Sequence, residues 1–170
     1  RRVAGGGMSL SVIVENDGQY ETVEGVGEER DYQTLSKDEI RSIVKEAGIV
    51  GMGGAGFPTH VKLTPKDDKA IDYILVNGAE REPYITADYR LMMENPEAIV
   101  GGLKVILQLF ENAKGVIAVE NNKPEAIKKL EALVAGEPRI SVAALLTKYP
   151  QGGERSLIYA VTGRKGNSSM

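Results

Sequence analysis

The residues best suited to bind a ligand lie in the segment 51–59. Four of its first six residues are glycines, namely Gly51, Gly53, Gly54 and Gly56. Because glycine has no Cβ, the backbone of such a segment can approach a ligand closely and turn successive amide groups toward one anion. Pro58 can open a helix directly afterwards, which would aim the positive end of that helix into the same space. Lys62 follows within about one helical turn and would add a full charge. This order of residues predicts a phosphate-binding loop.

A structural interpretation of the same glycines is a tight connection between packed elements, which is the usual role of an isolated glycine cluster. This cluster is longer than a turn requires. It is neither the dinucleotide fingerprint Gly-x-Gly-x-x-Gly, which follows a strand, nor a Walker loop, which ends in Gly-Lys-Ser/Thr. We therefore expect a phosphate cradle of a different kind.

A second group of polar residues comes directly after an expected strand at residues 71–76. The residues beyond a strand of an α/β sheet are those that contact ligands. Asn77 carries a donor and an acceptor, while Glu80 and Glu82 can accept hydrogen bonds from ribose or ribityl hydroxyls or from a ring N–H. A charged loop is usually just solvated, and the segment alone leaves both interpretations open.

Composition limits the chemistry that these residues can perform. The chain contains no cysteine and a single histidine, His60, which excludes disulfides, thiolate catalysis, iron–sulfur ligation and a histidine metal cluster within it. Any redox chemistry must then come from an organic cofactor. A formal net charge of -3 and a pI near 5.4 predict no general attraction to nucleic acid or anionic lipid. No apolar run approaches a membrane span, and a cytoplasmic location is expected.

Helices and strands are expected to alternate along the chain. Periodicity and capping signals indicate helices at residues 36–48, 86–93, 97–110, 124–134 and 154–161, and strands at residues 71–76, 115–119 and 139–145. Alternation of this kind predicts an α/β fold with a mostly parallel sheet flanked by helices and with ligands at the carboxyl ends of the strands. A strand, turn and strand over residues 9–23 predict a small N-terminal β-hairpin. We expect a single domain at residues 9–165, between flexible tails at residues 1–8 and 166–170.

Three strings of the sequence resemble the RnfC proteins of the Rnf electron-transport complex. They are GIVGMGGAGFPT at residues 48–59, NGAEREPYITAD at residues 77–88 and KYPQGGE at residues 148–154. The resemblance covers about residues 36–164 and extends more distantly to the flavoprotein subunit of respiratory complex I. It implies a Rossmann-like domain that binds FMN without a covalent bond and exchanges hydride with NAD(H). Electrons would pass to 4Fe-4S clusters outside this chain, and the partners would be other subunits of a membrane complex, with the chain peripheral on its cytoplasmic face.

The resemblance also implies which residues bind the cofactor. The flavin phosphate and ring would be lined by Gly51, Gly53, Gly54, Ala55 and Gly56, with Lys62 on the phosphate side. Contacts to the flavin would come from Asn77, Glu80 and Glu82. The other side of the cleft would be closed by Gly152, Gly153 and Glu154. Phe57 is a candidate platform for nicotinamide stacking, with a packing anchor as an equal alternative. We expect no catalytic side chain and no metal ligand.

The chain also departs from the family pattern. Arg81 stands where the family usually has cysteine, and its permanent charge and forked guanidinium would alter flavin affinity or nucleotide preference. On the family pattern we expect a further domain and a cysteine-rich iron–sulfur region, which these residues do not include, and an amino-terminal portion of which they include little. Two alternatives therefore stay open: an electron carrier of the cobalamin-reductase or proline-reductase type with the same domain, and a docking module that has lost its cofactor.

Overall fold

The structure is a computed structural model that describes residues 7–8, 10, 12–52, 55–80, 82 and 84–165. Contacts divide the chain into two compact units, Arg1–Asp31 and Tyr32–Met170. The break after residue 31 lies well inside the segment expected from the sequence to be one domain.

Over the residues of the first unit that the structure describes, the N-terminal hairpin expected from the sequence is not formed. Its expected turn is present, since the Gly18 N–H donates to Asn16 Oδ1 at 2.6 Å and Gly18 has a φ of 75°. Residues 12–31, however, contain no strand, and their side chains are exposed. The prediction of paired strands was therefore wrong. A two-stranded ribbon that packs against nothing is at best marginally stable in water, which explains why the turn alone forms.

The second unit is built on a three-stranded parallel sheet. Its strands are β1 (Tyr73–Gly78), β2 (Lys114–Glu120) and β3 (Ile140–Leu145), in the order β1-β2-β3. The central strand β2 is buried along its whole length after Lys114. This burial on both faces explains its nearly continuous apolar sequence. The strands follow one another across the sheet in the same order as along the chain, so the described sheet has no point at which the strand order reverses.

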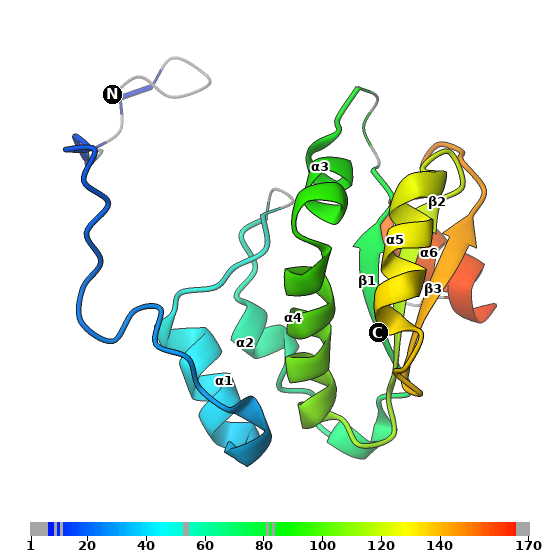
Figure 1. Ribbon diagram of the computed structural model, residues 1–170, viewed down its shortest axis with the longest axis horizontal. Helices are drawn as coiled ribbons and strands as arrows, with labels where there is room; N and C mark the ends of the chain where they lie inside the picture. The colour runs from blue at the N-terminus through cyan, green and yellow to red at the C-terminus, as the bar shows by residue number, and fades with distance from the viewer. Residues whose placement is uncertain are drawn as a thin grey trace. The chain divides into compact units, whose positions relative to one another are not determined.

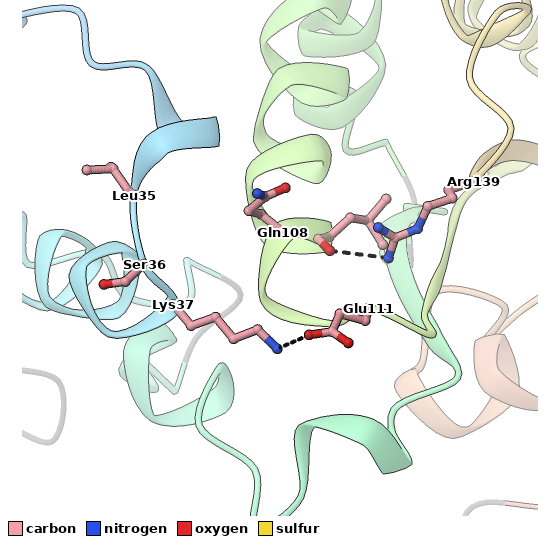
Figure 2. Close-up of a pocket in the computed structure, with 7 residues that line it drawn as sticks. Leu35, Ser36, Lys37, Gln108, Glu111 and Arg139 are labelled. Carbon is pink, nitrogen blue, oxygen red and sulfur yellow. Dashed lines mark hydrogen bonds and ion pairs between the residues drawn. The ribbon is translucent and has the colours of Figure 1, made fainter.

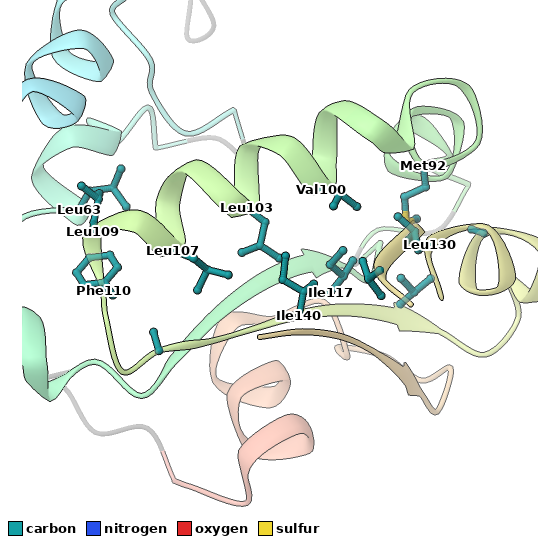
Figure 3. Packing of buried hydrophobic residues seen from close by; sticks show 14 of the residues in the cluster. Leu63, Met92, Val100, Leu103, Leu107, Leu109, Phe110, Ile117, Leu130 and Ile140 are labelled. Carbon is teal, nitrogen blue, oxygen red and sulfur yellow. The ribbon is translucent and has the colours of Figure 1, made fainter. Parts of the chain in front are cut away.

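Helices cover both faces of this sheet (Figure 1). Helices α3 to α6 form these layers, while the full set of this unit in chain order is η1 (Tyr32–Thr34), α1 (Lys37–Glu46), α2 (Thr59–Lys62), η2 (Asp68–Ala70), α3 (Ala87–Glu94), α4 (Pro96–Leu109), α5 (Pro124–Val134) and α6 (Glu154–Thr162). Helices α3 and α4 connect β1 to β2, and α5 connects β2 to β3. Helix α6 lies on the opposite face and packs against β1 and β3 (Figure 3). The predicted mostly parallel α/β fold is confirmed, and the expected helices and strands of this unit are all present.

The main core lies between the sheet and α4 and α5 (Figure 3). Helix α4 approaches β2 closely at Gly115, where an added Cβ would lie 2.9 Å from Leu103 Cδ2. A second, smaller cluster on the other face includes Ala118 and Leu157 of α6. Ile40 of α1 and Leu63 after α2 belong to the main core, so both ends of the glycine loop are anchored in it. Within the described part of the chain, no helix is both long and apolar enough to cross a membrane.

Candidate functional site

The carboxyl end of β1 brings two of the three candidate segments together. Asn77 Nδ2 donates a hydrogen bond to the Gly152 carbonyl at 2.9 Å, while its Oδ1 accepts one from the Ala79 N–H at 3.1 Å. The neighbouring Gly78 leaves no space for a side chain, because a Cβ there would lie 3.0 Å from the Ala118 carbonyl. The Asn77 side chain therefore ties the end of β1 to the turn before α6.

That turn is compact and ends at the first residue of α6. The Gln151 N–H donates to the Lys148 carbonyl at 2.7 Å, and the Gly153 N–H donates to the Pro150 carbonyl at 2.9 Å. Gly153 is the N-cap of α6, and a Cβ on it would lie 3.1 Å from the Pro150 carbonyl. Glu154 begins the helix with an exposed side chain. Gly152, Gly153 and Glu154 thus lie beside the end of β1.

Gln151 is a residue of this turn to which the sequence analysis gave no function. It is 2% exposed, and its Oε1 has no hydrogen-bond donor among the described residues. A buried acceptor without a donor costs free energy unless a donor is supplied. A ligand with an N–H or hydroxyl group would supply it, which fits a flavin with its ring N–H and ribityl chain. Its position inside the string at residues 148–154, directly before the predicted contact Gly152, was the signal in the sequence.

Glu80 has a different environment from the one expected for a flavin contact. Its Oε1 accepts hydrogen bonds from the Asp88 N–H at 2.9 Å and the Tyr89 N–H at 3.3 Å, in the first turn of α3. The N-cap of this helix, Thr86, makes no side-chain cap bond. Glu80 therefore does what a capping side chain does, satisfying amides that have no partner inside the helix. Direct contact between Glu80 and a flavin stays a prediction.

A lysine that the sequence analysis missed lies beside Glu80. Lys123 Nζ is 3.5 Å from Glu80 Oε2 and 3.3 Å from Glu120 Oε2. The side chains of Lys123, Glu80 and Glu120 are 12%, 4% and 7% exposed, respectively. Glu120 is the last residue of β2, and Lys123 precedes α5. The signal was available, because Lys123 follows the buried strand β2 just as Glu80 follows β1.

This charge cluster shifts the protonation of Asp88. Its carboxyl group loses part of its hydration, which raises its pKa, and the nearby Glu80 carboxylate raises it further, while the Lys123 ammonium group acts in the opposite direction. Tyr89, the next residue of α3, donates its hydroxyl group to Glu125 Oε2 at 3.2 Å. Loss of hydration and the Glu125 charge raise the pKa of Tyr89. The carboxyl ends of β1 and β2 therefore carry a connected set of ionisable groups.

The glycine loop is closed at its base by backbone hydrogen bonds. The Gly51 N–H donates to the Phe57 carbonyl at 2.9 Å, and the Thr59 N–H donates to the Ile49 carbonyl at 3.0 Å. The Gly51 amide is thus already bonded, which corrects the expectation that it is free for an anion. Gly53 and Gly54 lie outside the described residues. Donors for a phosphate would have to come from the tip of the loop.

The chain on either side of this loop rises toward the end of the unit at which the strands end (cyan in Figure 1). Ala55 is exposed, and Gly56 has a φ of 61°, a conformation that favours glycine. Phe57 is 51% exposed, which does not fit a core packing anchor and leaves ring surface for stacking. That the loop and the end of β1 face one ligand stays a prediction.

The cationic side of the loop is weaker than the sequence suggested. Pro58 is the N-cap of α2, as expected, but this helix has only four residues and its dipole is correspondingly small. Lys62 ends the helix with an exposed side chain that forms no ion pair with another described residue. The side-chain charge of Lys62 is therefore the main cationic feature here. Arg81 lies outside the described residues, and Glu82 is exposed.

A pocket of about 320 Å³ lies at the other end of the unit, near the starts of β2 and β3 (Figure 2). Its charged groups are already bonded within the protein. Lys37 Nζ is 3.2 Å from Glu111 Oε1, and the Arg139 guanidinium donates to the carbonyls of Leu107, in the last turn of α4, and of Ala113, just before β2. It has no unpaired charge with which to hold a phosphate. Across the described residues, no cluster of histidine and carboxylate side chains could bind a metal ion.

Comparison with known proteins identifies the family. Residues 44–170 match a family model described as the Nuo51 FMN-binding domain. The C subunit of a proton-translocating ferredoxin:NAD(+) oxidoreductase complex from Clostridium ljungdahlii is 46% identical over 95% of this chain and 35% of its own length. The C subunit of the Na(+)-translocating complex from Acetobacterium woodii is 44% identical over 95% of this chain and 37% of its own length. The chain thus spans about a third of the relatives' length.

Solved structures show the same fold. An NAD+-reducing [NiFe]-hydrogenase in the H2-reduced state contains a region with a TM-score of 0.63 at 23% identity, covering 83% of this chain and 27% of that one. The air-oxidized state of an NAD+-reducing [NiFe]-hydrogenase gives a TM-score of 0.62 at 26% identity, covering 78% and 24%. With the family match covering all three candidate segments, the chain belongs to the Nuo51 FMN-binding domain family and resembles the C subunits of ferredoxin:NAD(+) oxidoreductase complexes.

Proposed function

We propose that this chain binds FMN at the carboxyl end of β1 and serves as the site at which a flavin and NAD(H) exchange hydride. The observation that carries the proposal is the Asn77–Gly152 hydrogen bond, which joins two candidate segments within the region matched by the family. The buried Gln151 Oε1 beside it is an acceptor for which a flavin has suitable donors. The relatives are named as NAD(+) oxidoreductase subunits, which agrees with this chemistry.

When bound, FMN would supply the exchange of hydride with NAD(H) and the transfer of single electrons. The protein's own residues would bind and orient it. Amides at the tip of the glycine loop and the Lys62 ammonium group would hold the phosphate. Asn77 and Gln151 would meet polar groups of the ring or ribityl chain. Phe57 would offer its exposed ring to the nicotinamide.

The activity of the whole parent protein is a further part of the proposal. The relatives belong to multi-subunit ferredoxin:NAD(+) oxidoreductase complexes. We infer that electrons leave this domain for 4Fe-4S clusters outside the chain, and that other subunits hold it at the cytoplasmic face of the membrane. Which acceptor receives the electrons decides between this function and that of an electron carrier of the cobalamin-reductase or proline-reductase type.

An anaerobic titration with FMN tests the proposal. The fluorescence of the flavin should be quenched on binding, and NADH should bleach its visible absorbance. Gly51→Val should weaken FMN binding at least about tenfold, equivalent to about 1.4 kcal/mol. The reason is that the valine side chain would occupy space in the loop that glycine leaves open for a ligand. A Cβ at Gly51 makes only ordinary contacts, the nearest at 3.7 Å, so the fold should be retained.

The matched control is Gly136→Ala, because a Cβ at Gly136 meets nothing within 4 Å. This variant should bind FMN as the unaltered chain does. Absence of FMN binding by the unaltered chain and by Arg81→Cys would refute the cofactor assignment. Binding without bleaching by NADH would refute hydride exchange and leave a domain that only holds the flavin.

A further inference from the structure

We propose that Lys123 is a positioning residue for the flavin-binding segment after β1, and that it acts by holding the Glu80 carboxylate in its capping position on α3. The inference rests on the proposed function and deepens it, since it names a residue outside the three candidate segments. It also gives Glu80 a function other than contact with the flavin.

The contacts of Glu80 close a loop. Its Oε1 receives the N–H groups of Asp88 and Tyr89, eight and nine residues further along the chain. Between these points lie residues 81–87, which include Glu82, a predicted flavin contact. Glu80 precedes this segment in the chain, and its side chain is hydrogen-bonded to the residues that follow the segment. These bonds fix the distance between the two ends and so limit the conformations that the segment can adopt. The position of Glu82 therefore depends on whether Glu80 stays bonded to the first turn of α3.

Lys123 supplies the charge opposite the buried Glu80 carboxylate. The Glu80 side chain is 4% exposed, and a carboxylate removed from water is stable only with an opposite charge and hydrogen bonds. Lys123 supplies that charge at 3.5 Å and shares it with the Glu120 carboxylate. Without the ammonium group, two buried carboxylates would face each other's field uncompensated. The Glu80 side chain would then lose the contact that holds it in its capping position and would move toward water.

The arrangement also connects two strands. Glu80 follows β1, while Glu120 ends β2 and Lys123 precedes α5. The ammonium group therefore links the segment after β1 to the neighbouring strand end, across the hydrogen-bonded pair that ends at Gly78 and Val119. Hydrogen bonds with a charged partner are stronger than neutral ones. The bonds from the Asp88 and Tyr89 amides to the Glu80 carboxylate are therefore suited to holding the segment after β1 in place.

The test compares Lys123→Met, which keeps the length of the side chain without the charge, with Lys123→Arg, which keeps the charge. Lys128→Met is the matched control, because Lys128 is exposed on α5, the helix that Lys123 precedes. Amide exchange is measured by NMR at Asp88 and Tyr89 in the unliganded chain, and the FMN Kd by fluorescence quenching.

In Lys123→Met we expect exchange at both amides to accelerate about tenfold or more and the FMN Kd to rise about tenfold, a change equivalent to about 1.4 kcal/mol. Lys123→Arg should restore both quantities to within about threefold, and Lys128→Met should leave them unchanged. The double variant Glu80→Gln/Lys123→Met should bind FMN no more weakly than Lys123→Met, because both substitutions remove one linkage.

Unchanged exchange at Asp88 and Tyr89 in Lys123→Met would overturn the inference, whether or not FMN binds. Faster exchange with an unchanged Kd would also overturn it, because Lys123 would then support α3 without positioning the flavin site. An additive loss of affinity in the double variant would overturn it as well, by showing that Glu80 contacts the flavin directly. Failure of the unaltered chain to bind FMN would refute the proposed function instead, and the exchange measurement would still decide whether Lys123 holds the loop.

Discussion

Replacing Asn77 by aspartate would test the contact that joins the end of β1 to the turn before α6. Aspartate has nearly the same shape, so its Oδ1 can still accept the Ala79 N–H. Its second oxygen would face the Gly152 carbonyl, to which Asn77 Nδ2 now donates at 2.9 Å. A hydrogen bond is thereby replaced by a repulsion between two acceptors.

The magnitude follows from the exposure of this bond. A typical hydrogen bond contributes about 0.5–1.5 kcal/mol to stability. Because the Asn77 side chain lies at the surface, we expect a loss of about 1 kcal/mol, which lowers the Tm of a chain of this size by about 2–4 °C. FMN affinity should fall more, by about tenfold or more, because a negative charge enters the site and the Gly152 turn moves.

Calorimetry gives the Tm, and fluorescence quenching gives the FMN Kd. The control is Asn112→Asp, since Asn112 Nδ2 also donates to a backbone carbonyl, that of Lys69, at 3.3 Å, just before β2. This control should lose comparable stability or less and bind FMN normally. The reasoning is refuted if Asn77→Asp keeps the Tm and the Kd of the unaltered chain, or if both substitutions weaken FMN binding equally.

Two further predictions concern packing and pH. Gly115→Ala should lower the free energy of unfolding by about 1–3 kcal/mol, measured by urea denaturation, because the new Cβ would lie 2.9 Å from the buried Leu103 side chain. NMR titration of Asp88 should give a pKa above the ordinary value of 3.8. Lys123→Met should raise this pKa further and Glu80→Gln should lower it. Since the folded chain then binds this proton more tightly than the unfolded chain, ionisation of Asp88 reduces stability as pH rises from 3.8 through the folded pKa.

A specific result would refute each of these two predictions. Gly136→Ala adds a methyl group in open space and should be neutral or slightly stabilising. If Gly115→Ala is equally neutral, α4 and β2 do not pack as closely as described. An Asp88 pKa at or below 3.8, or a pKa that neither Lys123→Met nor Glu80→Gln changes, would show that the charges of Glu80 and Lys123 do not affect the Asp88 carboxyl group.

The helices and strands of the second unit could be predicted because their signals are local. Helix α1 is an example: the Ser36–Glu39 capping box predicted its start, and both reciprocal hydrogen bonds are present. The N-terminal hairpin failed because its turn is local but the pairing of its strands is not. Alternating side chains over residues 9–15 specify a strand only where a partner surface covers one face.

The candidate site divides in the same way. The polar residue types after β1, and the glycines before α2, were evident from the sequence. Their hydrogen bonds were not: Gly51 uses its amide to close its own loop, and Glu80 caps α3. Lys123 was missed because its partners precede it by three and by more than forty residues.

By itself the sequence determined the order and type of the elements of the second unit, the lack of cysteine ligands and the family, since each depends on residue identity and short-range spacing. Only the tertiary structure decided which polar atoms are already bonded and which remain available. Parallel strands bring their carboxyl ends together from distant parts of the chain. Asn77 therefore meets Gly152, and Glu80 meets Lys123, although the members of each pair lie far apart in the sequence.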